Sequence, residues 1–215
     1  MILGIFIEYL WKDPRFFFTV TFLVVFSVCC HEFMHAWTAL KQGDPTAADA
    51  GHLTLNPMKQ MGWFSLLLLA LFGLAWGQVP VNPGNLRKPG AAVKVALAGP
   101  LTNLALAFLF LLLCSILIRL GFPNEQGTYM IFYGSVLNIV LFVLNMIPVP
   151  GFDGYTVFSH FFPRFLHFNS EAATVVTVVL ILILFGSFGY ITLGAQYLAR
   201  LLLSLLLIGA GEGGA

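Results

Sequence analysis

Charged side chains are scarce in this chain of 215 residues. Asp, Glu, Lys and Arg make up only 9% of the sequence, whereas soluble domains carry about 25%. Hydrophobic residues account for 59%, and the mean hydropathy is +0.92. This composition excludes an ordinary soluble fold and predicts a protein that crosses the membrane several times.

Basic clusters and paired cysteines are also missing. The formal net charge is +1 and no run of Lys and Arg occurs, so nothing indicates a nucleic-acid partner. The three cysteines, Cys29, Cys30 and Cys114, lie in apolar segments without a Cys-x-x-Cys pattern. We expect them to pack as small hydrophobic side chains.

Long apolar runs predict an all-α polytopic membrane protein, a bundle of about five to six transmembrane helices. The runs cover residues 16–40, 61–77, 90–120, 129–147 and 172–208. Gly186 and Gly189 could divide the last run into two spans, or it forms one span and an interfacial tail. We expect one integral membrane domain over residues 1–215, with its core at about 16–155 and C-terminal helices at 172–208.

The connection between the first two runs, residues 41–60, is polar and rich in Gly and Pro. Leu53-Thr54-Leu55 alternates like a short strand, and Asn56-Pro57 is typical of a helix start. His52 lies in this connection. Its residue type and position fit a metal ligand, a substrate-binding group or a surface residue.

The run His31-Glu32-Phe33-Met34-His35 lies inside the first apolar segment. Positions i and i+4 of a helix share one face, so His31 and His35 can bind one metal ion. Glu32 is then placed to act as a general base, the H-E-x-x-H pattern of zinc hydrolases. A carboxylate at membrane depth costs about 2.5–3.5 kcal/mol, which favours a functional role. The alternative is a His–Glu–His hydrogen-bond cluster that holds helices together.

Two further segments place polar groups in apolar surroundings. Pro148 and Pro150 force extended backbone after the fourth run, and Asp153 follows this break. Such backbone is tolerated at membrane depth only inside protein or beside water, and a carboxylate there suits a third metal ligand. Asn103 follows Pro100 within the third run, and we expect its side chain to face protein or a cavity.

These motifs together resemble the site-2 protease family of intramembrane zinc metalloproteases. Three signatures occur in the family's order: His31-Glu32-Phe33-Met34-His35, Gly99-Pro100-Leu101-Thr102-Asn103, and the N-x-x-P-x-P-x-x-D-G run from Asn145 to Gly154. The chain departs from the family where many members have a small residue in place of Met34. It also has no inserted PDZ domain and no appended CBS domain.

The resemblance implies one zinc ion per chain, bound by His31, His35 and Asp153, with Glu32 as catalytic base. It implies that Asn145 lies beside the site, where it holds substrate backbone or the oxyanion, and that Asn103 is a supporting contact. The stretch from His52 to Pro57 is similar to the family's re-entrant β-like segment.

The expected function is zinc-dependent endopeptidase activity on transmembrane segments of membrane-anchored substrates. The expected partners are a substrate's transmembrane helix and the lipid bilayer, in a multi-pass protein of a prokaryotic cell membrane. The alternative is a metal-binding membrane protein without proteolysis, or a transporter. The family fold implies a zinc site near the cytosol, whereas Lys12 and Arg15 before the first run and Arg87 and Lys88 after the second weakly favour the opposite orientation.

Overall fold

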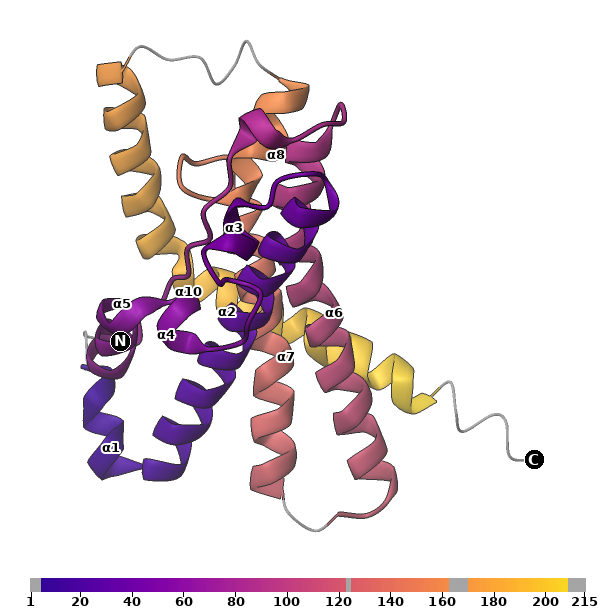
Figure 1. Cartoon of the computed structure of the whole chain (residues 1–215). Helices are drawn as coiled ribbons and strands as arrows, with labels where there is room; N and C mark the ends of the chain where they lie inside the picture. The colour runs from indigo at the N-terminus through magenta and orange to yellow at the C-terminus, as the bar shows by residue number, and fades with distance from the viewer. Residues whose placement is uncertain (1–4, 123–124, 163–169, 209–215) are drawn as a thin grey trace. The chain divides into compact units, whose positions relative to one another are not determined.

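The computed structural model describes residues 5–122, 125–162 and 170–208 (Figure 1). Helices dominate, and this described part contains no β-strand. The chain divides into two compact units, Met1–Thr102 and Asn103–Ala215. The predicted all-α organisation is confirmed.

The first unit is built on α2, which runs from Pro14 to Lys41. Asp13 caps it by accepting a hydrogen bond from the Phe16 amide at 3.1 Å, and Pro14 occupies the first helical position. Its buried residues follow helical spacing, and His31, Glu32 and His35 belong to the buried set. The first apolar run therefore forms one long helix with the motif in its C-terminal half.

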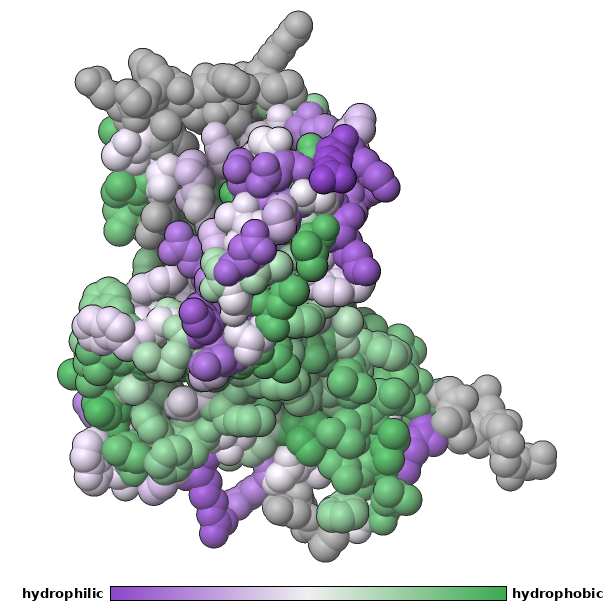
Figure 2. Space-filling model, in the orientation of Figure 1, coloured by the Kyte–Doolittle hydropathy of each residue, from purple (hydrophilic) through white to green (hydrophobic). Residues whose placement is uncertain are grey.

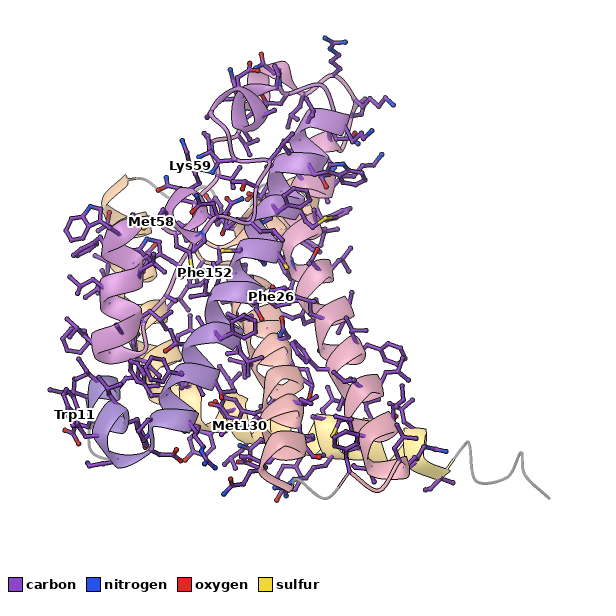
Figure 3. All side chains as sticks on the ribbon, turned by 60° about the horizontal axis from the view of Figure 1, so that its bottom comes forward. Trp11, Phe26, Met58, Lys59, Met130 and Phe152 are labelled. Atoms are coloured by element: carbon purple, nitrogen blue, oxygen red, sulfur yellow. The ribbon has the colours of Figure 1, made fainter. Side chains whose placement is uncertain are left out.

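A short N-terminal segment packs beside the start of α2. It contains the 3₁₀ turn η1 (Phe6–Glu8) and helix α1 (Tyr9–Lys12). Phe6 stacks on Phe17 of α2 with ring centroids 5.0 Å apart. Trp11 projects outward from α1 (Figure 3) and is 73% exposed, which suits an aromatic side chain at a membrane interface.

Short elements connect α2 to α6. They are α3 (Thr46–Asp49), α4 (Pro57–Gln60), α5 (Gly62–Phe72) and the 3₁₀ turn η2 (Pro83–Asn85). Asn56 caps α4 through a 2.9 Å bond from the Met58 amide, so the helix start predicted at Asn56-Pro57 is confirmed.

The strand expected at Leu53-Thr54-Leu55 does not form. Gln60 is buried against this stretch. Its side-chain amide donates to the carbonyls of His52 at 2.8 Å and Thr54 at 2.5 Å. These carbonyls are satisfied by one side chain instead of a neighbouring strand.

The second apolar run is shorter as a helix than its sequence suggested. Helix α5 has 11 residues, about 16 Å at 1.5 Å per residue, whereas a spanning helix needs about 20 residues. It stops at Gly73, which takes the left-handed conformation with φ of 75°. The chain beyond Gly73 leaves the helix although it is still apolar.

Helix α6 (Ala91–Arg119) continues through Pro100 and carries the boundary between the two units. In the second unit its C-terminal part packs with α7 (Glu125–Asn145) and with the second half of α10 (Ser170–Ile208). The shared core consists of Ala107, Leu111, Val136, Ile139, Val140, Ala195 and Ala199.

Helix α10 is a single helix of 39 residues. Its axis turns partway along, between the orange and yellow parts in Figure 1. By residue number, Gly186 and Gly189 fall near the middle of this helix. Glycines commonly mark such bends. At the yellow end, Arg119 of α6 donates to the carbonyls of Leu206 at 2.6 Å and Leu207 at 2.9 Å, which satisfies the last turn.

Four helices in the described residues are long and apolar enough to cross a membrane: Pro14–Lys41, Ala91–Arg119, Gln126–Asn145 and Thr177–Ile208. Helix α5 is a shorter apolar helix beside these four, and the last apolar run forms one helix rather than two. Figure 2 shows hydrophobic side chains over the long helices and hydrophilic ones over the connection that follows α2.

Candidate metal and catalytic site

His31 and His35 face one another across one turn of α2. Their ring centroids lie 4.6 Å apart and their Nε2 atoms 2.9 Å apart, and each residue is 6–7% exposed. Two nitrogens bound to one zinc at about 2.0–2.1 Å in tetrahedral geometry would lie about 3.3 Å apart. A small opening of the two rings would therefore suffice for both to bind one ion.

The tautomer of His35 is fixed by helix α6. Nδ1 of His35 lies 2.7 Å from the carbonyl oxygen of Val95, which can only accept, so Nδ1 carries the proton and donates. Nε2 then keeps its lone pair for a metal. This arrangement is the one found where a second group orients a metal-binding histidine.

Gly99 provides room in front of the two imidazoles. A Cβ added at Gly99 would overlap Nε2 of both His31 and His35. Gly99 lies inside α6 and has ordinary helical geometry, so an open space rather than an unusual backbone explains glycine here. The residues present thus fit a zinc ion: two aligned nitrogen donors, one with a fixed tautomer, and a space that a side chain would fill.

Glu32 lies against the backbone of Gly77. A Cβ added at Gly77 would overlap Cγ, Cδ and Oε1 of Glu32. Glu32 is 7% exposed, so its carboxylate is held at a buried point where the segment that follows α5 meets α2.

The segment around Gly77 is held in place by hydrogen bonds to Trp76, Gln78 and Asn82. The Ser65 hydroxyl accepts from the Trp76 amide at 3.0 Å and donates to the Trp76 carbonyl at 2.7 Å. The Gln78 amide donates to the Gln60 carbonyl at 3.0 Å, and the Asn82 amide donates to Asp44 at 2.7 Å. Residues 76, 78 and 82 are therefore each held by hydrogen bonds to a different residue of the first unit.

Asp44 links the end of α2 to this segment and is completely buried. Burial raises the pKa of its carboxyl, but hydrogen bonds from Thr46, from Asn85 and from the Asn82 and Thr46 amides outweigh it and lower the pKa to about 2. Asp44 is therefore a charged acceptor at every physiological pH.

His52 packs on Gln60, with its Nδ1 atom 3.2 Å from the Gln60 side-chain oxygen. It is partly buried. This hydrogen bond helps to hold the loop that precedes α4. A part for His52 in catalysis or metal binding stays a prediction.

In the second unit, Asn145 ends α7 and Asp153 begins α8 (Asp153–Phe161). The turn between them is tight, because a Cβ at Gly154 would overlap the Met146 carbonyl. Asn145 uses its side-chain amide to donate to the Leu141 carbonyl at 3.0 Å. The assignments of Asp153 as third ligand and of Asn145 beside the site stay predictions.

Asn103 is buried between α6 and α7. Its side-chain amide donates to the Asn138 side-chain oxygen at 3.0 Å, and Asn138 donates to the Gly134 carbonyl at 2.9 Å. Asn103 therefore faces protein as expected. It bridges two helices of the second unit. Its role as a supporting contact of the site stays a prediction.

Sequence reasoning missed the residues that support Glu32 and the histidines. Gly77, Ser65, Gln60 and Asp44 make these contacts across 6 to 45 positions of the chain, so no local pattern reveals them. Isolated glycines in apolar runs were the one available signal, since they often mark a close approach of other groups.

Comparison with known proteins agrees with this geometry. The model of peptidase family M50 matches residues 19–121, which include the H-E-x-x-H motif and Gly99. The "Putative zinc metalloprotease YwhC" of Bacillus subtilis is 35% identical over 176 residues, 79% of this chain and 80% of the relative. The "Putative zinc metalloprotease MJ0611" of Methanocaldococcus jannaschii is 30% identical over 162 residues, 70% of this chain and 76% of the relative.

A longer relative matches as well. The "Putative zinc metalloprotease Rip2" of Mycobacterium tuberculosis is 35% identical over 143 residues, 60% of this chain but 51% of that protein. No solved structure matches the chain. The extent of the similarity to YwhC and MJ0611 shows that the chain belongs to peptidase family M50, the site-2 protease family.

Proposed function

We propose that this chain is a zinc-dependent endopeptidase that cleaves membrane-anchored substrates within the bilayer. The observation that carries the proposal is the buried group formed by His31, His35 and Glu32 in the helix α2, which is apolar and long enough to span. Membership of peptidase family M50 supports the same chemistry. The proposed location is a prokaryotic cell membrane, which the chain crosses several times.

One zinc ion per chain would be held by His31, His35 and Asp153. When bound, it supplies a Lewis acid that activates water and polarises the scissile carbonyl. The donor set suits zinc, because catalytic zinc sites combine three protein ligands of nitrogen and oxygen type with one open position. The tautomer of His35, set by Val95, supports this assignment.

Glu32 would accept a proton from the attacking water and deliver it to the leaving amine. Its contact with Gly77 fixes the carboxylate, so little reorganisation is needed at the moment of proton transfer. Asn145 is proposed to hold substrate backbone or the developing oxyanion. Asn103 is proposed to act indirectly, through its bond to Asn138 that keeps α6 and α7 in register.

The segment from Gly77 to Val81 offers an edge for an extended substrate. Within the described ranges, no hydrogen bond is found for the amides of Gly77, Val79 and Val81, whereas the amides of Trp76, Gln78 and Asn82 are bound. Unpaired backbone groups of this kind recruit a further strand. This edge lies beside Glu32 and is better placed for strand addition than residues 52–55, whose carbonyls Gln60 already occupies.

A transmembrane substrate must therefore unwind locally before it is cut, because a helix uses its own backbone groups. The proposed substrate class is a transmembrane helix with helix-breaking residues near the scissile bond. A strand added at this edge would lie about 4.8 Å from residues 77–81, within reach of Glu32.

The test uses the detergent-purified chain and its Glu32→Gln variant. The probes are tagged single-span helices with a Gly-Pro pair placed at different depths. We expect both proteins to contain zinc and only the wild type to cleave, because glutamine cannot accept the proton. Cleavage by Glu32→Gln, or a wild type that binds no zinc when zinc is supplied throughout, would refute the proposal.

A metal transporter is the second candidate. It requires ionisable groups in series across several helices. The described motif instead gathers His31, Glu32 and His35 within one turn of α2. Zinc uptake into proteoliposomes, without cleavage of any probe, would favour the transporter.

A further inference from the structure

Ser65 makes an unusual pair of hydrogen bonds for a serine in a helix. It lies in α5, is completely buried, and bonds both backbone groups of Trp76, which is 11 positions away. A helical serine commonly returns its hydroxyl to its own helix, as Ser135 does toward the Phe132 carbonyl. Ser65 instead takes the place that a neighbouring strand would take beside Trp76.

The two bonds act next to the contact with Glu32. Gly77 follows Trp76 directly, and its backbone lies against the Glu32 side chain. Successive residues of an extended chain are about 3.3 Å apart, so a displaced Trp76 displaces Gly77 with it. A shift of Ser65 would therefore also shift Gly77 and, with it, the Glu32 carboxylate that Gly77 contacts.

The two hydrogen bonds further along this segment cannot replace those of Ser65. Gln78 is bound by the backbone carbonyl of Gln60, on the far side of Gly77. Asp44 binds Asn82, five residues beyond Gly77 and about 16 Å along an extended chain. On the N-terminal side of Gly77, Ser65 supplies the side-chain hydrogen bonds to the Trp76 backbone, and the Phe64 ring packs edge-on against the Trp76 ring at 5.9 Å.

We propose that Ser65 is a positioning residue for the reaction, because it holds the Trp76–Gly77 peptide against Glu32 and keeps the edge at residues 77–81 extended. The inference rests on the proposed protease function. It assigns Ser65 no contact with substrate or metal. Its effect passes through Gly77 to the general base.

The experiment compares Ser65→Ala, Ser65→Thr and the control Ser135→Ala. Ser135 is also completely buried, and its hydroxyl bond is local to α7. We expect Ser65→Ala to keep its zinc and to lose about 10- to 100-fold in kcat with a smaller change in KM, because misplacement of a catalytic group by about 1 Å costs up to about 100-fold. Ser65→Thr keeps a hydroxyl and should recover most of the loss, whereas Ser135→Ala should keep the wild-type kcat.

Hydrogen–deuterium exchange supplies a readout that does not depend on cleavage. Ser65→Ala should accelerate exchange of the Trp76 amide, and Ser135→Ala should not. Wild-type kcat in Ser65→Ala, or equal losses of kcat in the two alanine variants, would overturn the inference. A wild type that holds zinc but cleaves no probe would overturn the proposed function instead, and the exchange result would still decide whether Ser65 holds the segment.

Discussion

His35 donates from Nδ1 to the Val95 carbonyl at 2.7 Å, and this bond joins the metal-binding face of α2 to α6 one turn before Gly99. The same stretch of α6 therefore orients one imidazole and leaves space in front of both. A substitution in this stretch should therefore weaken metal binding more than it destabilises the overall fold.

Gly99→Ala tests that relationship. The added methyl group would overlap Nε2 of His31 and His35, whereas alanine itself is favourable in a helix. We expect zinc affinity to fall by about 10- to 100-fold, the range for changes that disturb the orientation of metal ligands. Zinc content by mass spectrometry measures the loss. Gly186→Ala is the control, since no atom lies within 4 Å of its Cβ position; equal zinc content in both variants would contradict the prediction.

Gly77→Ala should separate catalysis from metal binding. Its methyl group would overlap Glu32 and not the histidines, so zinc should stay while the carboxylate moves. Cleavage of the tagged helices is expected to fall by about 100-fold or more. Zinc content measured on the same sample is the companion readout. Loss of zinc together with activity would mean that Gly77 supports the whole site rather than Glu32.

Asp153→Ala tests the proposed third zinc ligand. We expect the purified wild type to hold about one zinc per chain and the variant to lose it or bind it weakly, because two histidines alone leave the site short of a donor. His52→Ala is the comparison variant and should keep its zinc, because His31, His35 and Asp153 already complete the proposed set of three protein ligands. Unchanged zinc in Asp153→Ala would move the third ligand elsewhere, with His52 examined next.

The lowered pKa of Asp44 predicts that the stability of the first unit falls at acidic pH. Its pKa is lowered to about 2 from 3.8, so the charged form is favoured in the folded state. Its contribution to stability is complete above about pH 3.8 and is lost as the pH falls through about 2. Asp44→Asn should destabilise the fold by about 1–3 kcal/mol at pH 7 and flatten this acid dependence. Thermal unfolding of both proteins between pH 2 and 7 measures the difference, and parallel curves would refute the prediction.

Asn103 and Asn138 form a pair suited to a double-mutant cycle. Their side chains meet at 3.0 Å in the buried interface of α6 and α7. Hydrogen bonds between membrane helices are worth about 0.6 kcal/mol on average and up to about 2. Replacing each and both by leucine, and measuring unfolding in detergent, should give a coupling energy in this range. A coupling energy near zero would contradict a stabilising bond between Asn103 and Asn138.

The long helices and the H-E-x-x-H motif were predictable, because apolar length and the spacing of four residues are local properties of the sequence. The length of α5 was not, since residues 74–77 are as apolar as the helix they follow and only Gly73 marks its end. The strand at Leu53–Leu55 failed for a tertiary reason: Gln60 satisfies the carbonyls that a second strand would have bound. The contact of Gly77 with Glu32 spans 45 positions and needs the fold itself.

The shortness of α5 also bears on how the chain enters the membrane during synthesis. Because α5 is shorter than the helices long enough to cross, we expect the end of α2 and the start of α6 to lie on the same side of the membrane. That face collects five basic residues: Lys41, Lys59, Arg87, Lys88 and Lys94. Only Lys12 and Arg15 stand at the other end of α2. Insertion retains such loops in the cytoplasm, so we expect the motif in the C-terminal half of α2 to lie toward that compartment, the reverse of the orientation indicated when α5 is counted as a span.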